Sequence, residues 1–277
     1  MADVLLSFYN IVVGQFNYDG STYSTNRINQ MGDSFEKFVK NSFLAQPDES
    51  RAGTTLSNVF SYLGSSTRPP DAMLRNGDVL EIKKVESSSG QLQFNSSFPK
   101  QKLHHDDEMI SNDCKSSEDW TERDVVYYVG VIPKKSDFPT DILIVSGDCF
   151  AASRRHYEDT FREVQVALHD SFGPKLSVSK ELGRINNVDP QANTSLRIRG
   201  MWLVSNPIQW LAKARLSSSF QVTLVLSQVK YNKYNEESRA TLESLVGTLV
   251  TMKFVKLPNP DGQEMPEIDC VRFQFER

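Results

Sequence analysis

A turn signal between two short apolar runs constrains the fold of this chain more than any other feature. Residues 69–83 read PPDAMLRNGDVLEIK, with Asp71 before an Asn-Gly pair and Glu81 and Lys83 after it. Asn-Gly between strand-like runs is typical of a β-hairpin. Alternate residues of a strand share a face, so we expect Glu81 and Lys83 to point the same way and Ile82 to point into apolar packing.

The length of the turn decides where Asp71 lies. A two-residue loop of Asn76 and Gly77 would put Asp71 on the face opposite to Glu81. A three-residue loop that starts at Arg75, with Gly77 in the left-handed conformation as a G1 bulge, puts Asp71 directly across from Glu81. We predict the three-residue loop.

Two carboxylates and one amine that meet on a hairpin have a definite chemistry. The acids can hold a divalent cation, and the lysine can contact the attacking water or the phosphate that is cut. The hairpin therefore predicts metal-dependent hydrolysis of a phosphodiester by Asp71, Glu81 and Lys83. The alternative is an ordinary exposed hairpin whose charged side chains are only solvated.

Three long blocks of the sequence give this hairpin a wider context. They read SYLGSSTRPPDAMLRNGDVLEIKK at residues 61–84, QLQFNSSFPKQKLHHDD at 91–107 and ELGRINNVDPQANTSLRIRGMWLVSNP at 181–207. In this order they closely resemble the NgoPII family of type II restriction endonucleases. The resemblance runs from about residue 30 to about residue 210, and nothing is carried onto the two ends of the chain.

The resemblance implies a fold, an activity and a cofactor. The implied fold is α/β, with a mixed central β-sheet flanked by helices and a PD-(D/E)xK nuclease core. The implied activity is a Mg²⁺-dependent double-strand cut in a short G+C-rich palindrome, for which GGCC is the expected target. Asp71, Glu81 and the backbone carbonyl of Ile82 would hold the Mg²⁺, with Glu36 as a further acid from the preceding helix; the alternative for Glu36 is an exposed helix residue.

The chain has the length and composition of one enzyme domain. It has 277 residues, 39% of them hydrophobic, and we predict a single nuclease domain over residues 1–277 with additions to the core at both ends. The first apolar stretch contains Asp3 and lacks a basic start, so it predicts a helix rather than a signal peptide or membrane span, and a cytoplasmic protein. The three cysteines, without metal-site spacing, indicate reduced thiols.

Charge is unevenly distributed along the chain. The net charge is −4, whereas affinity for DNA needs basic groups near the phosphates. Residues 175–215 are strongly basic, and residues 106–124 are strongly acidic. We expect the basic block to face DNA; a solvated surface is the alternative. Its cations are Lys175, Lys180, Arg184, Arg197, Arg199, Lys213 and Arg215.

Two segments supply candidate DNA contacts. Arginines on a strand or loop can read guanine in the major groove, and phosphate contacts or surface ion pairs are the alternatives. A small polar loop after the hairpin can straddle the DNA backbone, or can be a plain surface turn. The candidates are Arg184, Asn186, Arg197 and Arg199 in the basic block, and Asn95, Ser96, Ser97, Lys100 and Lys102 in the loop.

Further elements follow from periodicity. Uncharged β-branched runs at 124–132 and 141–147 predict two adjacent buried strands. Residues 151–169 repeat apolar side chains at helical spacing, and we expect this helix to cover the sheet. Asp33 is a plausible N-cap for a helix with its buried stripe at Phe35, Phe38, Val39 and Phe43.

The remaining segments complete the expected fold. Residues 195–205 alternate as one strand that carries Arg197 and Arg199 on one face. The C-terminal part predicts a strand at 220–232, an amphipathic helix at 236–250 and a closing hairpin.

Because the chain has no Gly-rich phosphate loop, we expect no nucleotide cofactor. A palindromic target implies a homodimer. The rival functions are a structure-selective repair or recombination nuclease with the same core, and a noncatalytic DNA-binding protein.

Overall fold

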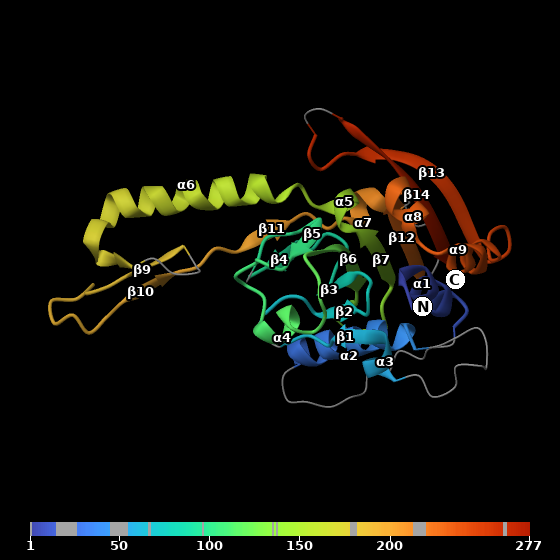
Figure 1. Ribbon diagram of the computed structural model, residues 1–277, viewed down its shortest axis with the longest axis horizontal. Coiled ribbons are helices and arrows are strands. Elements are labelled where there is room, and N and C mark those ends of the chain that lie inside the picture. The colour runs from blue at the N-terminus through green and yellow to red at the C-terminus, as the bar shows by residue number, and fades with distance from the viewer. Residues whose placement is uncertain are drawn as a thin grey trace.

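A large β-sheet with helices on both faces forms the body of the molecule, and a long arm leaves it on one side (Figure 1). The computed structural model describes the backbone of residues 2–14, 27–44, 55–65, 68–95, 97–134, 136, 138–177, 182–212, 220–262 and 265–277, and the side chains of these residues except 27–33. Within these parts of the chain, no helix has the length and apolar character needed to cross a bilayer.

The sheet is mixed, as the sequence predicted. Its strands follow the order β1-β2-β3-β6-β7-β12-β14-β13, and β5 pairs with β6 beyond this path. The pairs β3–β6 and β7–β12 are parallel, and the other neighbours are antiparallel. The strands are β1 (Phe60–Tyr62), β2 (Ala72–Leu74), β3 (Val79–Val85), β5 (Lys102–His104), β6 (Glu122–Val131), β7 (Asp141–Ser146), β12 (Gln221–Ser227), β13 (Val250–Pro258) and β14 (Glu267–Glu276). The predicted neighbouring strands at 124–132 and 141–147 are confirmed as β6 and β7.

Strand β6 shows how the sheet separates two cores. Val126 and Tyr128 belong to one apolar cluster, whereas Val125, Tyr127 and Val129 belong to the other, because alternate side chains leave opposite faces. The first cluster includes residues of α1 (Val4–Val12), α2 (Arg27–Ser42), α3 (Leu56–Val59), α8 (Gln228–Lys233) and α9 (Glu236–Glu243). The second includes residues of α4 (Asn112–Lys115), α5 (Gly147–Phe150) and α7 (Ile208–Leu211).

Helix α2 confirms one prediction and corrects another. Phe35, Phe38, Val39 and Phe43 are all buried, which confirms the apolar stripe. The helix begins at Arg27, however, so the expected N-cap at residue 33 was wrong. Aspartate occurs both at helix N-caps and inside helices, so the residue type alone does not show where a helix begins. Here the helix continues through residue 33.

A buried ion cluster fixes the turn end of the β2–β3 hairpin. The Lys230 ammonium of α8 contacts the carboxylates of Asp78 and Asp124, the latter at 2.8 Å, and the Tyr234 hydroxyl donates to Asp78 at 2.7 Å. The neighbouring carboxylates outweigh burial and hold the pKa of Lys230 above its usual value. Because buried charges are stable only when paired, this cluster ties the hairpin to the C-terminal part of the chain.

The arm is built from one long helix and a small antiparallel sheet. It comprises α6 (Arg154–Phe172), the 3₁₀ turn η2 (Gly173–Lys175), β8 (Leu176–Ser177), β9 (Gly183–Ile185) and β10 (Leu196–Ile198). At its base, β11 (Trp202–Val204) pairs with β4 (Leu92–Phe94). Figure 1 shows α6 leading away from the body and the small sheet returning below it.

The arm overturns two expectations. Helix α6 has no buried residue and does not cover the main sheet. Its apolar stripe contacts β8 and β9 instead, since periodicity reveals an apolar face but not its partner. The strand predicted over 195–205 is divided into β10 and β11, which belong to different sheets.

The C-terminal predictions are confirmed in part. Strand β12 ends at Ser227 and α8 follows it, so the single strand expected over 220–232 was wrong in its second half. Helix α9 ends at Glu243, earlier than expected, and the β13–β14 hairpin is confirmed. The N-terminal helix is confirmed as α1, whose start is capped by the Asp3 carboxylate, which accepts from the Leu6 N–H at 3.0 Å.

Candidate active site

The hairpin turn has the predicted length. Ala72 pairs with Leu80, and the Leu74 N–H donates to the Asp78 carbonyl at 2.9 Å, which leaves three residues in the loop. The left-handed residue is Asn76, with φ of 52°, and not Gly77 as predicted. Asparagine tolerates this conformation because its short side-chain amide can bond to the nearby backbone, so the left-handed residue lies one position earlier than predicted.

The same register brings Asp71 across from Glu81. Met73 and Val79 belong to one apolar cluster, so strand alternation places Asp71 and Glu81 on that face as well. The Asp71 N–H donates to the Leu80 carbonyl at 3.1 Å, and its Oδ2 accepts from the Ile82 N–H at 2.6 Å. The carboxylate therefore takes the place of a backbone acceptor just before β2 begins, and this fixes its orientation.

The chain crosses close behind Asp71 at Gly64. This glycine has φ of 88°, and a Cβ atom built on it would lie 2.3 Å from the Asp71 carbonyl oxygen. Only a residue without a side chain fits both the backbone angle and the space. The crossing segment thus supports the position of Asp71.

Glu81 and Lys83 form an ion pair beside Asp71. The Lys83 Nζ lies 3.0 Å from the Glu81 carboxylate and 5.1 Å from the centre of the Phe94 ring. Burial raises the pKa of Glu81; Lys83 opposes this shift and Asp71 adds to it. Burial lowers the pKa of Lys83, but Glu81 and Asp71 outweigh it, so the net pKa lies above the usual value. Lys83 is thus a fixed cation at neutral pH.

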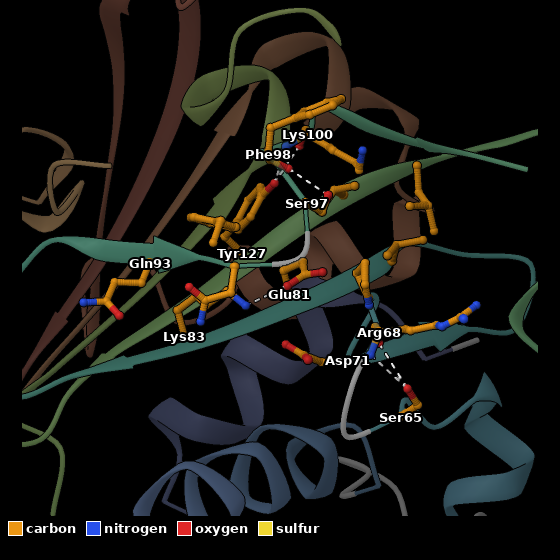
Figure 2. Close-up of a pocket in the computed structure, with 16 residues that line it drawn as sticks. Ser65, Arg68, Asp71, Glu81, Lys83, Gln93, Ser97, Phe98, Lys100 and Tyr127 are labelled. Carbon is orange, nitrogen blue, oxygen red and sulfur yellow. Dashed lines mark hydrogen bonds and ion pairs between the residues drawn. The ribbon is translucent and has the colours of Figure 1, made fainter. Parts of the chain in front are cut away.

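These three side chains share a pocket of about 220 Å³ (Figure 2). In this view the loop residues Phe98 and Lys100 lie above Glu81, whereas Arg68 and Asp71 lie below it. Two carboxylates and three cations line the pocket. The polar and aromatic residues of its wall are Ser65, Arg68, Asp71, Glu81, Lys83, Gln93, Phe94, Asn95, Ser97, Phe98, Lys100 and Tyr127.

The donor set fits a hard divalent cation. Two carboxylates, both facing one polar pocket, match Mg²⁺, which takes one or two protein carboxylates together with water and substrate phosphates. Among the described residues, no three His, Cys, Asp or Glu side chains gather into a metal cluster. Glu36 pairs with Lys40 and does not line the pocket, but its charge contributes to the raised pKa of Lys83.

The polar loop after β4 meets the pocket with only some of the predicted residues. Asn95, Ser97 and Lys100 line it, and residue 96 lies outside the described residues. Lys102 does not line the pocket. It pairs with Glu122 and borders a separate cavity. The loop therefore divides its two lysines between different environments.

The arm places two predicted arginines side by side. Arg184 lies directly across from Arg197 in the β9–β10 pair, so both leave the same face. Arg184 is on a strand and not on the loop that the sequence suggested, and Arg199 lies just beyond β10. The Asn186 side-chain amide donates to the Ser177 hydroxyl within the arm. Lys180, Lys213 and Arg215 fall outside the described residues.

Several pocket residues were missed from sequence. Tyr127 lies in register with Glu81 across the parallel β3–β6 pair, and Gln93 belongs to β4. Only the strand pairing reveals that they share the site. Arg68 directly precedes the Pro-Pro-Asp run, and this adjacency was a usable signal.

Comparison with known proteins agrees with this geometry. The model of the NgoPII restriction endonuclease family matches residues 2–258. The chain belongs to this family. It is 35% identical to the type II restriction enzyme NgoPII of Neisseria gonorrhoeae over 258 residues, which cover 91% of each chain. No solved structure matches the chain significantly.

Membership of the NgoPII family tests several predictions made from the sequence. The restriction endonuclease activity and the α/β nuclease fold are confirmed at the level of the NgoPII family. The expectation that the resemblance stops at about residues 30 and 210 was wrong, because the match extends well toward both ends.

Proposed function

We propose that this NgoPII family member is a Mg²⁺-dependent, homodimeric enzyme that makes double-strand cuts in DNA at GGCC. The observation that carries the catalytic part is the register of the β2–β3 hairpin, which puts Asp71 and Glu81 face to face with Lys83 beside them. The target follows the family resemblance, and the paired arginines of the arm suit a G+C-rich sequence.

Each residue of the hairpin has a distinct task in this proposal. Asp71 and Glu81, with the Ile82 carbonyl, would hold Mg²⁺, and Glu36 would support the site from α2. When bound, the cation supplies Lewis acidity at the phosphate and a lowered pKa for water. Lys83 directs the attacking water and stabilises the negative charge that grows on the phosphoryl oxygens. The water oxygen bonds to phosphorus while the bond to the 3′ oxygen breaks.

Recognition is assigned to surfaces outside the pocket. Arg184, Arg197 and Arg199 would meet base edges or phosphates along the arm, with Asn186 holding the arm strands together. The loop residues Asn95 to Ser97 would follow the backbone near the cut. Lys100 and Lys102 add positive charge to this loop.

Digestion of a plasmid tests the proposal. With Mg²⁺ we expect discrete fragments whose sequenced ends all fall in GGCC, and no cutting with EDTA. Unselective nicking or a preference for branched DNA would favour the repair-nuclease rival, and no cutting with any divalent cation would favour a binding protein.

The dimer has its own test. Wild-type subunits mixed with inactive Asp71→Asn subunits should nick one strand of the site, because each subunit of a two-fold dimer cuts one strand. Sedimentation should give twice the mass of the 31.4 kDa chain. A sedimenting monomer that still cuts both strands would contradict the homodimer.

A further inference from the structure

Lys100 is a nearly buried cation for which the hairpin chemistry has no task. Its exposed fraction is 8%, and its Nζ lies 3.5 Å from the Asp107 carboxylate and 3.7 Å from the centre of the Phe98 ring. Burial lowers the pKa of Lys100, and Asp107 opposes this shift only in part. Burying an ammonium group costs free energy. The cation–π contact and the single carboxylate together offset only part of this cost.

The backbone of Lys100 is fixed to the catalytic strand pair. The Tyr127 hydroxyl accepts from the Lys100 N–H at 2.6 Å and donates to the Lys100 carbonyl at 2.9 Å. Tyr127 is fully buried and lies in register with Glu81. One phenol thus sets the position of Lys100 relative to the carboxylate that would hold the metal.

Aromatic packing also fixes the ring beneath the ammonium group. Phe98 stacks on Tyr157 with ring centres 5.0 Å apart and meets Trp202 edge-on at 6.4 Å. Tyr157 belongs to α6 and Trp202 to β11, so the two segments that lead into and out of the arm both support Phe98. The wall of the pocket that carries Lys100 is therefore a built structure.

Charge in the pocket points to an anionic occupant. Lys100 lowers the pKa of Glu81 across the pocket, and Arg68 and Lys83 also line it. Three cations and two carboxylates line the pocket, and Asp107, which pairs with Lys100, lies outside this lining. A phosphate group is the anion that a nuclease pocket receives.

We propose that Lys100 is a second catalytic cation, whose ammonium group binds a nonbridging oxygen of the phosphate that is cut, from the wall opposite Asp71. This inference rests on the proposed function. Lys100 forms no covalent bond and transfers no proton; it stabilises the negative charge on the phosphoryl oxygens while the 3′ oxygen leaves. Asp107 is a positioning residue that holds the ammonium group over the pocket.

Lys256, on the edge strand β13 at the far end of the sheet order from β3, provides a control lysine. Lys100→Met should lower the single-turnover cutting rate at saturating DNA about 100-fold. The Kd for the target duplex in Ca²⁺ should change little, because the other phosphate contacts remain. Lys256→Met should leave the rate close to wild type, since Lys256 is exposed, pairs with Asp269 at 3.3 Å and does not line the pocket. A Lys100→Met enzyme that cuts as fast as wild type would overturn the proposal.

A double variant separates chemistry from folding. Lys100→Met leaves the buried Asp107 carboxylate with Arg154, at 4.0 Å, as its remaining cation among the described residues, and so is expected to lower Tm. Lys100→Met with Asp107→Asn removes this buried charge and should restore Tm without restoring the rate. Recovery of both would mean that Lys100 is only structural, and the proposal would be wrong.

Asp71→Asn distinguishes this inference from the proposed function. If Asp71→Asn is inactive and Lys100→Met is fully active, the hairpin site stands and the role of Lys100 fails. If Asp71→Asn still cuts, the proposed active site fails, and the role of Lys100 fails with it.

Discussion

The main sheet and the arm differ in how many of their residues are buried. In β6 all seven residues from Val125 to Val131 are buried, and in β12 every residue is buried. In the described part of the arm, only Gly183 and Ile185 are buried. Burial in the sheet holds Asp71 and Glu81, the proposed catalytic carboxylates, in place. The arm buries few of its residues, so its arginines lie on a surface with little core behind it.

The strongest test of this contrast is a change of one charge in the sheet. Asp71→Asn should lower the cutting rate at least about 1,000-fold, because a metal contributes several kcal/mol to such a transition state. The fold should persist, since the asparagine oxygen can still accept from the Ile82 N–H. Rates and Tm measured together check this.

Asp269→Asn is the control for that substitution. Asp269 is exposed on β14, far along the sheet, and pairs with Lys256 at 3.3 Å. The Asp269→Asn enzyme should cut DNA at the wild-type rate. Normal cutting by Asp71→Asn would remove the hairpin from the active site.

Breaking an ion pair at the main sheet should lower the free energy of unfolding of the protein more than breaking one in the arm. Lys230→Met leaves Asp78 without its cation and Asp124 with Lys233, at 3.8 Å, and should cost about 3–5 kcal/mol. Arg155→Met removes an exposed pair with Asp159 on α6 and should cost less than about 0.5 kcal/mol. Urea unfolding measures both. Equal effects would mean that the arm is as tightly integrated as the sheet.

Arm substitutions should affect recognition and spare the fold. Arg184→Ala or Arg197→Ala should each weaken binding of the target in Ca²⁺ by about 1–3 kcal/mol and relax the discrimination against altered sites. Arg162→Ala on α6 is the control. An equal loss on all sequences would assign these arginines to phosphate instead of bases, and no loss would remove the arm from the DNA surface.

The smallest expected effect is a pH dependence in the buried ion cluster. Burial tends to raise the pKa of Asp124, but Lys230 outweighs it and holds the pKa below the ordinary value of 3.8. The Asp124 contribution to stability is therefore present above pH 3.8 and lost as the pH falls through the folded pKa. Urea unfolding from pH 6 to pH 3 should show a shallower loss for Asp124→Asn. An identical slope would mean that the carboxylate is not stabilised by the fold.

Sequence predicted the body of the molecule better than the arm. The register of the hairpin followed from turn length and strand alternation, both of which are local rules. The position of the left-handed residue did not, because Asn76 and Gly77 both tolerate it. Periodicity also could not predict what α6 packs against, because Tyr157 contacts Phe98 and Trp202, which are distant in sequence.

The site was predicted where its residues are neighbours along the chain. Asp71, Glu81 and Lys83 belong to one hairpin, whereas Tyr127 joins the pocket only through the β3–β6 pairing. Lys100 and Lys102 looked equivalent in sequence, and only burial separates them. Pairing and burial depend on the whole fold.

The close crossing at residue 64 bears on how this enzyme can vary. Gly64 has no side chain that could contact DNA or a cation, yet any side chain there must displace the carbonyl of Asp71. A genetic selection for loss of restriction should therefore recover substitutions of this glycine together with those of the acids. Efforts to alter specificity have more freedom on the arm, whose exposed residues can be exchanged without disturbing the chemistry.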